Sequence, residues 1–163
     1  MRKKLGRSTN LVRAGDPPLP EGELIFEHSF AADTELKNES LNLLLAVLRR
    51  QGALKSDSAE ARYRLCLDEA LVNAVMHGSK YDHTKNVHVR AWLSSTTWTV
   101  IVSDEGSGFR EEDLPDPDAA ENLLEESGRG VHLIRSIMNT VSYWRGGRTL
   151  LIAATVEAAP PAS

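Results

Sequence analysis

The chain has 163 residues, of which 41% are hydrophobic and 26% charged, and these values are typical of one globular domain with a single core. Its formal net charge of −4 argues against the clustered basic surface that binds nucleic-acid phosphates, and no apolar run reaches the length of a membrane span. The single cysteine, Cys66, excludes an internal disulfide and is typical of a reducing cytoplasm. We therefore expect a cytoplasmic protein with no direct contact to nucleic acid or membrane.

One folded domain is expected between two tails. Residues 1–22 are polar and include the proline-rich run DPPLP, so they predict a flexible N-terminal tail. The hydrophobic patterns of secondary structure begin at residue 23 and end near residue 157. The last residues, 158–163, read AAPPAS and predict a short C-terminal tail.

The domain opens with a predicted strand and a predicted helix. Residues 23–30 alternate partly between apolar and polar side chains, which indicates a strand near a sheet edge. Residues 34–50 predict a helix, because leucines recur there at positions i, i+3, i+4 and i+7. Gly52 is expected to end this helix, and Asp57 or Ser58 to cap the next one.

The next stretch, Arg62–Gly78, predicts a long and mostly buried helix that carries two polar residues in apolar surroundings. Glu69 and Asn73 lie four residues apart and therefore share one helix face. Burying a carboxylate and an amide without partners is unfavourable. The pair is either bonded internally at a helix edge or part of a binding site, and the rest of the chain has to decide between these alternatives.

The remaining pattern completes an α+β fold. Alternation of apolar and polar residues predicts a strand at 86–93, and a short turn leads into another strand at 98–103. A later helix begins near residue 128, and two strands joined by a tight Gly-Gly turn follow it at 141–144 and 149–156. Hairpin-connected strands predict a two-layer α/β sandwich, with helices on one face of a mixed, largely antiparallel sheet.

Two glycine-rich segments lie at the ends of predicted elements. The run DEGSG, residues 104–108, follows a strand, and the run GRG, residues 128–130, opens a helix. Either run alone is a weak signal, because tight turns and close packing also require glycine. Neither is a Walker P-loop or a Rossmann fingerprint, whose further residues are missing. The acidic segment between them, residues 111–126, is long enough to indicate a functional loop.

The order of three motifs is the strongest signal in the chain. E-x-x-x-N-A at residues 69–74, D-x-G-x-G after a strand and G-x-G at a helix start together resemble the Bergerat-type ATP-binding fold of GHKL proteins, which include histidine kinases and type II topoisomerases. The phrases DEALVNAVMHGSKYD and SGRGVHLIRSIMNTVSY are most similar to anti-sigma factor serine kinases of the RsbW/SpoIIAB type. The resemblance extends over roughly residues 24–156.

This resemblance implies that the chain binds ATP and Mg²⁺. Asp104 would accept the adenine amino hydrogen, and Asn73 would offer an amide oxygen to Mg²⁺. Glu69 is implied as the catalytic carboxylate that orients or deprotonates the incoming hydroxyl. Residues 111–126 would form a nucleotide-gated lid. The expected nucleotide-binding residues are Asn73, Asp104, Gly106, Gly108, Gly128, Arg129 and Gly130, the last three holding phosphates at a helix N-terminus.

The same resemblance implies a function and partners. The chain would be a serine/threonine protein kinase that phosphorylates a STAS-domain anti-sigma factor antagonist, sequesters a sigma factor or similar regulator, and forms a homodimer. The alternative from another class is a module that binds nucleotide and sequesters a partner without appreciable phosphoryl transfer. The presence of Glu69 favours the enzyme.

Overall fold

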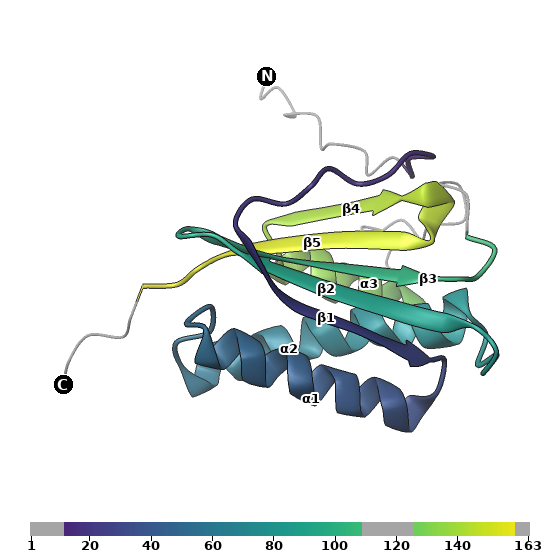
Figure 1. The fold of residues 1–163 in the computed structure, drawn as a ribbon, viewed down its shortest axis with the longest axis horizontal. Coiled ribbons are helices and arrows are strands. Elements are labelled where there is room, and N and C mark those ends of the chain that lie inside the picture. The colour runs from purple at the N-terminus through teal and green to yellow at the C-terminus, as the bar shows by residue number, and fades with distance from the viewer. Residues whose placement is uncertain (1–11, 109–125, 159–163) are drawn as a thin grey trace, which may run out of the picture.

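The computed structural model describes residues 12–108 and 126–158, the first four of the second range by their backbone alone. Within these ranges five strands form one sheet in the order β1-β2-β3-β5-β4, and each neighbouring pair is antiparallel (Figure 1). The predicted strand at residues 23–30 is confirmed at one edge of the sheet. The strands are β1 (Glu23–Ala31), β2 (Asn86–Leu93), β3 (Thr97–Asp104), β4 (Thr140–Trp144) and β5 (Thr149–Thr155).

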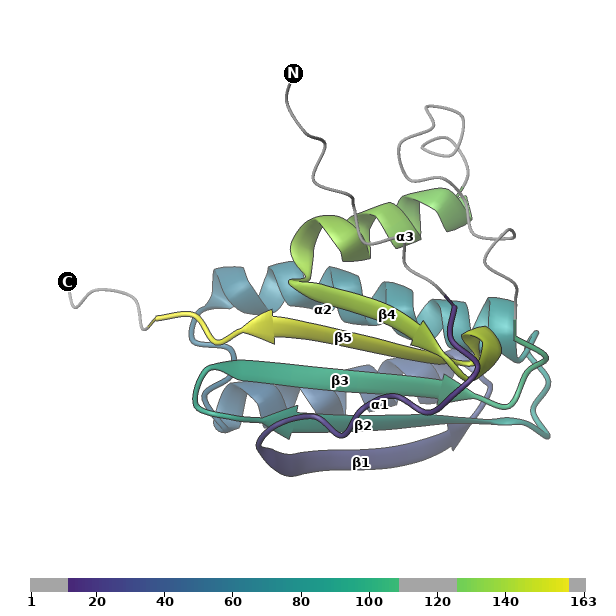
Figure 2. The same ribbon diagram turned by 90° about the horizontal axis from the view of Figure 1, so that it is seen from above.

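Helices cover one face of this sheet. The α-helices of the described residues are α1 (Thr34–Arg50), α2 (Asp57–Val72) and α3 (Glu126–Ile137), and α2 continues directly into a π-helical turn, η1 (Asn73–Gly78). Figures 1 and 2 show the helices on the same side of the sheet, which confirms the predicted α+β sandwich. None of the helices in the described part of the chain has both the length and the apolar character needed to cross a membrane.

The core places α2 against the middle of the sheet. Alternate residues of β2, namely Val87, Val89 and Ala91, are fully buried, as the predicted period of two requires. Tyr63 of α2 meets Trp98 of β3 edge to face, with 5.0 Å between the ring centres. Because this packing fixes α2 along the sheet, the end of the helix comes to lie beside the end of β3.

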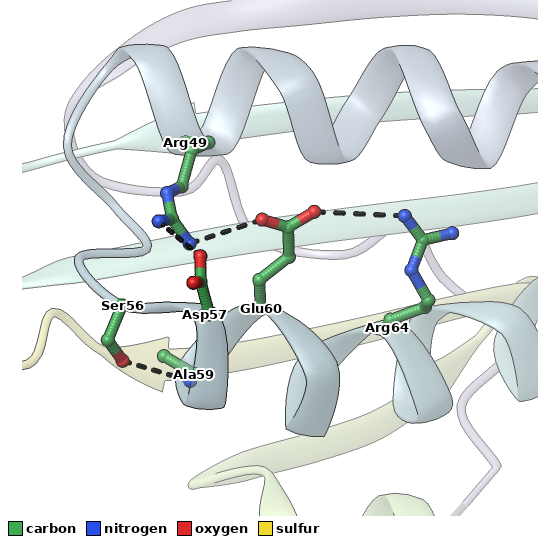
Figure 3. Close-up of polar contacts among 6 residues, drawn as sticks. All are labelled: Arg49, Ser56, Asp57, Ala59, Glu60 and Arg64. Carbon is green, nitrogen blue, oxygen red and sulfur yellow. Dashed lines mark hydrogen bonds and ion pairs between the residues drawn. The ribbon is translucent and has the colours of Figure 1, made fainter.

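A short, well-bonded connection joins α1 to α2. Gly52 has a φ of +83°, and the N–H of Ala53 donates to the carbonyl of Leu48 at 2.9 Å, which gives α1 a Schellman ending. Arg49 in the last turn of α1 donates to Oε2 of Glu60 on α2 at 3.1 Å (Figure 3). The expected helix end at Gly52 is therefore confirmed.

The cap of α2 differs from the prediction of Asp57 or Ser58. Ser56 caps the helix, because its Oγ accepts a hydrogen bond from the N–H of Ala59 at 3.0 Å (Figure 3). Ser56 has an extended backbone, with φ −151° and ψ 160°, whereas Asp57 is already the first helical residue. A capping residue has to stand just outside the helix, so the cap falls on Ser56.

The segment expected to be a flexible N-terminal tail is in part held against the sheet. Residues 1–11 lie outside the described residues, as do residues 159–163 of the predicted C-terminal tail. From Val12, which forms a parallel bridge with Tyr143 of β4, the chain runs across the sheet face opposite the helices to reach β1 (Figure 2). Backbone hydrogen bonds join Arg13 and Gly15 to the end of β4 and to the turn that follows it.

The sheet face that this segment crosses is apolar at its centre. Trp92, Ile101 and Leu151 form a buried cluster there, and Trp144 packs against it. Alternation along the strands directs these side chains away from the helices. The N-terminal segment contacts the edge of this cluster through Arg13, whose guanidinium carbon lies 4.6 Å from the centre of the Trp144 ring.

Candidate functional site

The first predicted motif lies where α2 changes into η1. Glu69 is in the last turn of α2 and Asn73 is the first residue of η1, and both side chains are half-buried. Wider turns of this type occur frequently at functional sites. The binding of a ligand by Asn73 stays a prediction, and so does the choice between the two alternatives drawn from the sequence.

The second predicted motif is locked to the end of η1. Oδ1 of Asp104 accepts a hydrogen bond from the N–H of Gly106 at 2.8 Å. A Cβ atom on Gly78 would collide with the Asp104 carboxylate, and one on Gly106 would collide with the carbonyl oxygen of Gly78. These three residues fit together because two of them are glycines. The sequence indicated Gly78 simply as a helix end, so its contact with Asp104 is an addition from the structure.

The Asp104 carboxylate is half-buried. Burial raises the pKa of this carboxyl above its ordinary value of 3.8. The hydrogen bond from Gly106 acts in the opposite direction, and so do the positive charges of Arg148 and Lys85. A half-buried acceptor with one oxygen held by a backbone N–H presents a fixed hydrogen-bonding group to whatever binds beside it.

The third predicted motif contacts the first through Gly130. This residue is buried in α3, and a Cβ atom on it would collide with Oε2 of Glu69. Glycine therefore permits α3 to approach α2 at this point. The helix begins at Glu126, two residues before the expected start at Gly128, so the G-x-G run lies inside its first turns. The side chain of Arg129 lies outside the described residues, and its role in phosphate binding stays a prediction.

Gly108 connects the second motif to the turn between β4 and β5. It has a φ of +76°, and a Cβ atom on it would collide with the carbonyl oxygen of Gly146. The N–H of Asp104 donates to the carbonyl of Arg148 at 2.9 Å. Sequence patterns predicted this turn as a simple hairpin. Its position beside the site follows from the sheet order, because β5 pairs antiparallel with β3 and so begins where β3 ends.

Cys66 does not have the properties of a nucleophile. Cys66 is fully buried, and burial raises the pKa of its thiol to about 11, with the charge of Glu69 adding to the increase and that of Arg62 opposing it. A thiol with such a pKa is protonated at neutral pH and is not a nucleophile. The predicted lid comprises residues 111–126. Residues 111–125 lie outside the described residues, and Glu126 is described by its backbone alone.

Comparison with known proteins identifies the family. The family model described as the histidine kinase-like ATPase domain matches residues 30–155. The chain belongs to this family. It is also similar to the serine-protein kinase RsbW of Bacillus subtilis, with 32% identity over 84 residues, and to that of Bacillus licheniformis, with 31% identity over 84 residues. These alignments cover 48% of this chain and 52% of each relative, so the chain spans about half the length of these curated relatives.

A third relative is matched over a longer region. The serine/threonine-protein kinase BtrW of Bordetella bronchiseptica is 28% identical over 107 residues, which are 63% of this chain and 75% of that protein. The resemblance to GHKL proteins, and within them to kinases of the RsbW type, is thereby confirmed.

Proposed function

We propose that this chain binds ATP with Mg²⁺ and transfers the γ-phosphoryl group to a serine or threonine hydroxyl of another protein. The convergence of the three motifs carries the proposal. Asp104 fits between Gly78 and Gly106, and Glu69 fits against Gly130, so the stretch from Glu69 to Gly78 contacts both of the other motifs. The family, and relatives named serine-protein kinases, support the same reading.

The end of β3 would hold the base of the nucleotide. The fixed Asp104 carboxylate can accept the adenine amino hydrogen, since its other oxygen is already oriented by the N–H of Gly106. The absence of side chains at Gly106 and Gly108 lets the carbonyls of Gly78 and Gly146 pack against them, which would hold the loop beside the base in place. Binding of this kind needs a rigid acceptor, and the contact with Gly78 supplies that rigidity.

Asn73 and the start of α3 would hold the phosphates with their metal ion. Mg²⁺ prefers oxygen ligands and usually keeps several waters and phosphate oxygens, so a single amide oxygen from Asn73 fits this chemistry. When bound, the ion neutralises charge on the phosphates. The positive dipole end of α3 would attract the phosphates themselves, with Gly128 and Arg129 in its first turn and Gly130 directly after it.

Glu69 would act on the incoming hydroxyl. It lies one helical turn from Asn73 on the same face, and its carboxylate reaches Gly130 of α3. A carboxylate between the metal-binding residue and the phosphate-binding helix can orient the hydroxyl and accept its proton. Phosphoryl transfer requires mainly positioning and charge stabilisation, so this small set of groups suffices.

The proposed protein substrate is a STAS-domain anti-sigma factor antagonist, and the proposed second partner is a sigma factor or similar regulator. Both proposals rest on the resemblance to anti-sigma factor kinases and on the names of the relatives. A homodimer and a cytoplasmic location belong to the same proposal. Competition between the two partners for the chain would then depend on which nucleotide is bound.

The test is a transfer assay with labelled ATP, Mg²⁺ and STAS-domain proteins of the same genome, run beside direct measurement of ATP affinity. Glu69→Gln is expected to lower the transfer rate by about 10²- to 10⁴-fold while ATP affinity changes by less than about threefold, because a general base contributes to the rate and not to binding. Asn73→Ala is expected to weaken Mg²⁺-dependent ATP binding.

Glu39→Gln is the matched control, since Glu39 is exposed on α1 and should leave both quantities unchanged. ATP binding by the wild-type chain without transfer to any candidate would identify a nucleotide-binding, partner-sequestering module. No ATP binding at all would overturn the assignment of the site.

A further inference from the structure

We propose that the N-terminal segment, residues 12–16, positions the nucleotide site by holding the turn of residues 145–148 between β4 and β5. The inference rests on the proposed nucleotide binding. Nothing in the sequence motifs involves these residues, and the sequence predicted a flexible tail for them. Two sets of contacts carry the proposal: those between the segment and the turn, and those between the turn and the site.

Backbone hydrogen bonds join the segment to the turn. The N–H of Arg13 donates to the carbonyl of Tyr143 at 3.1 Å, and the carbonyl of Arg13 accepts from the N–H of Gly146 at 2.9 Å. The N–H of Arg145 donates to the carbonyl of Gly15 at 3.0 Å. The segment therefore pairs with the end of β4 and continues the pairing into the turn, where an ordinary edge strand would have unpaired groups.

Side chains strengthen this pairing at both ends. Nε of Arg145 donates to Oδ1 of Asp16 at 2.6 Å. The guanidinium carbon of Arg13 lies 4.6 Å from the centre of the Trp144 ring, a cation–π distance. Since the Asp16 carboxylate is largely exposed, the ion pair alone is weak, and the backbone bonds supply most of the attachment.

The turn itself has a backbone that needs external support. Arg145 has a φ of +50°, in the left-handed region that residues with a Cβ atom rarely adopt, and Gly146 and Gly147 follow at +66° and +91°. A non-glycine residue persists in this region when its surroundings determine it. The surroundings of Arg145 are the carbonyl of Gly15 and the carboxylate of Asp16.

The same turn contacts the proposed base-binding residues. The carbonyl of Gly146, whose own N–H is bonded to Arg13, lies against Gly108 and occupies the place of a side chain there. The carbonyl of Arg148 accepts the N–H of Asp104 at 2.9 Å. An unbroken series of contacts thus runs from the segment through the turn to Gly108 and Asp104. Release of the segment would let the turn relax and would displace the loop that holds the adenine.

The experiment uses the full chain and the double variant Arg13→Pro with Asp16→Asn. Proline removes the N–H that Arg13 donates, and asparagine removes the charge that Arg145 binds. We expect ATP affinity, measured by titration calorimetry, to weaken by about threefold to tenfold. Asp16→Asn alone should weaken it by about twofold, since all backbone bonds remain, and Asp16→Glu should restore it.

Two matched controls separate this effect from general damage. Leu19→Ala alters an exposed side chain in the same crossing segment, and Glu157→Gln breaks an ion pair with Arg62 at the opposite end of β5. Both are expected to leave ATP affinity unchanged. Circular dichroism establishes that each variant is folded before its affinity is measured.

A second measurement needs no variant and does not depend on the folding of any. Linkage requires that, if the segment favours ATP binding, ATP stabilises the segment to the same extent. Hydrogen exchange of the wild-type chain should therefore slow at the amides of Arg13, Arg145 and Gly146 when ATP is added. ATP that slows exchange at residues 104–108 but not at these amides would overturn the inference, as would equal affinities in all variants. Failure of the wild-type chain to bind ATP would instead overturn the proposed function.

Discussion

Two carboxylates in this molecule each lie against a glycine, and the two contacts are built differently. Asp104 has a short side chain at a strand end, and it is enclosed by the backbone of Gly78 and Gly106 and bonded by an N–H. Glu69 has a longer side chain, and it is the far end of that chain which meets Gly130. The first contact is rigid because backbone atoms cannot move aside, whereas the second can adjust by rotation of the side chain.

This difference agrees with the separate tasks proposed for the two groups. A residue that recognises a base benefits from a fixed acceptor, because preorganisation lowers the loss of freedom on binding. A residue that accepts a proton from an incoming hydroxyl has to adapt to a second protein. Substituting each glycine and each carboxylate in turn tests whether the first contact is rigid and the second adjustable.

The largest effect is expected from Gly106→Ala, which attacks the rigid contact. The new Cβ atom would collide with the carbonyl oxygen of Gly78, and neither backbone can yield without moving Asp104. We expect the free energy of unfolding to fall by about 1–3 kcal/mol, as for other overpacked sites. ATP affinity should fall by about 100-fold, because the hydrogen bond that orients a charged acceptor is lost. Urea unfolding and titration calorimetry measure the two quantities.

Ser95→Ala is the control for this substitution. Ser95 is exposed in the turn between β2 and β3, at the end of β3 away from Asp104, and its replacement should alter neither stability nor affinity. If Gly106→Ala retained wild-type ATP affinity, the loop after β3 would be free to shift, and the contact at Asp104 would not be rigid.

Asp104→Asn is expected to weaken ATP binding by about 30-fold without a matching loss of stability. Asparagine can still accept the N–H of Gly106 through its oxygen, but its amide group then faces the adenine amino group as a second donor. The free energy of unfolding of the variant, relative to that of the wild type, should increase as the pH rises. In the folded chain burial raises the pKa of Asp104, so its contribution to stability is fully present below the unfolded value of 3.8 and is lost as pH rises through the folded value.

The variant lacks this titration, and its stability relative to the wild type should therefore rise as pH increases from below 3.8 toward neutrality. Urea unfolding at a series of pH values measures this difference. Glu105→Gln, at the neighbouring exposed carboxylate, serves as the control for ATP affinity. A variant that is less stable than the wild type at every pH would show that Asp104 supports the fold and is not a group kept at the expense of stability.

Elements that depend on neighbours in sequence could be predicted well. The helix at Thr34–Arg50 has the bounds that its leucine spacing and Gly52 indicate, and the strand at Asn86–Leu93 follows from strict alternation. The polar pair Glu69 and Asn73 was found because helical periodicity makes an unexpected residue visible. Local signals were sufficient in these cases because the forces that decide the structure act within one element.

Features that depend on distant contacts could not be predicted. The π-helical turn at Asn73–Gly78 could not be predicted from a helical period of 3.6 residues. One extra residue in a single turn shifts only a few apolar positions away from that period. The role of Gly78 depends on Asp104, which is brought to it by the packing of α2 on the sheet. The N-terminal residues 12–16 have the composition of a loop, and their attachment depends on an unpaired strand edge far along the chain.

The smallest expected effect belongs to Gly130→Ala, which tests the adjustable contact. Alanine in a helix is favoured over glycine by about 1 kcal/mol, and the atom it would meet is the end of the flexible Glu69 side chain. Stability should therefore stay the same or rise slightly, and ATP affinity should change by less than about threefold. Phosphoryl transfer should fall by about tenfold, because a displaced carboxylate no longer meets the hydroxyl in a productive geometry.

Ser136→Ala raises helix propensity on the exposed side of α3 and is the control for the gain in stability. If Gly130→Ala weakened ATP binding as strongly as Asp104→Asn, the two carboxylates would share one task, and the distinction between a rigid binding contact and an adjustable catalytic one would have to be abandoned.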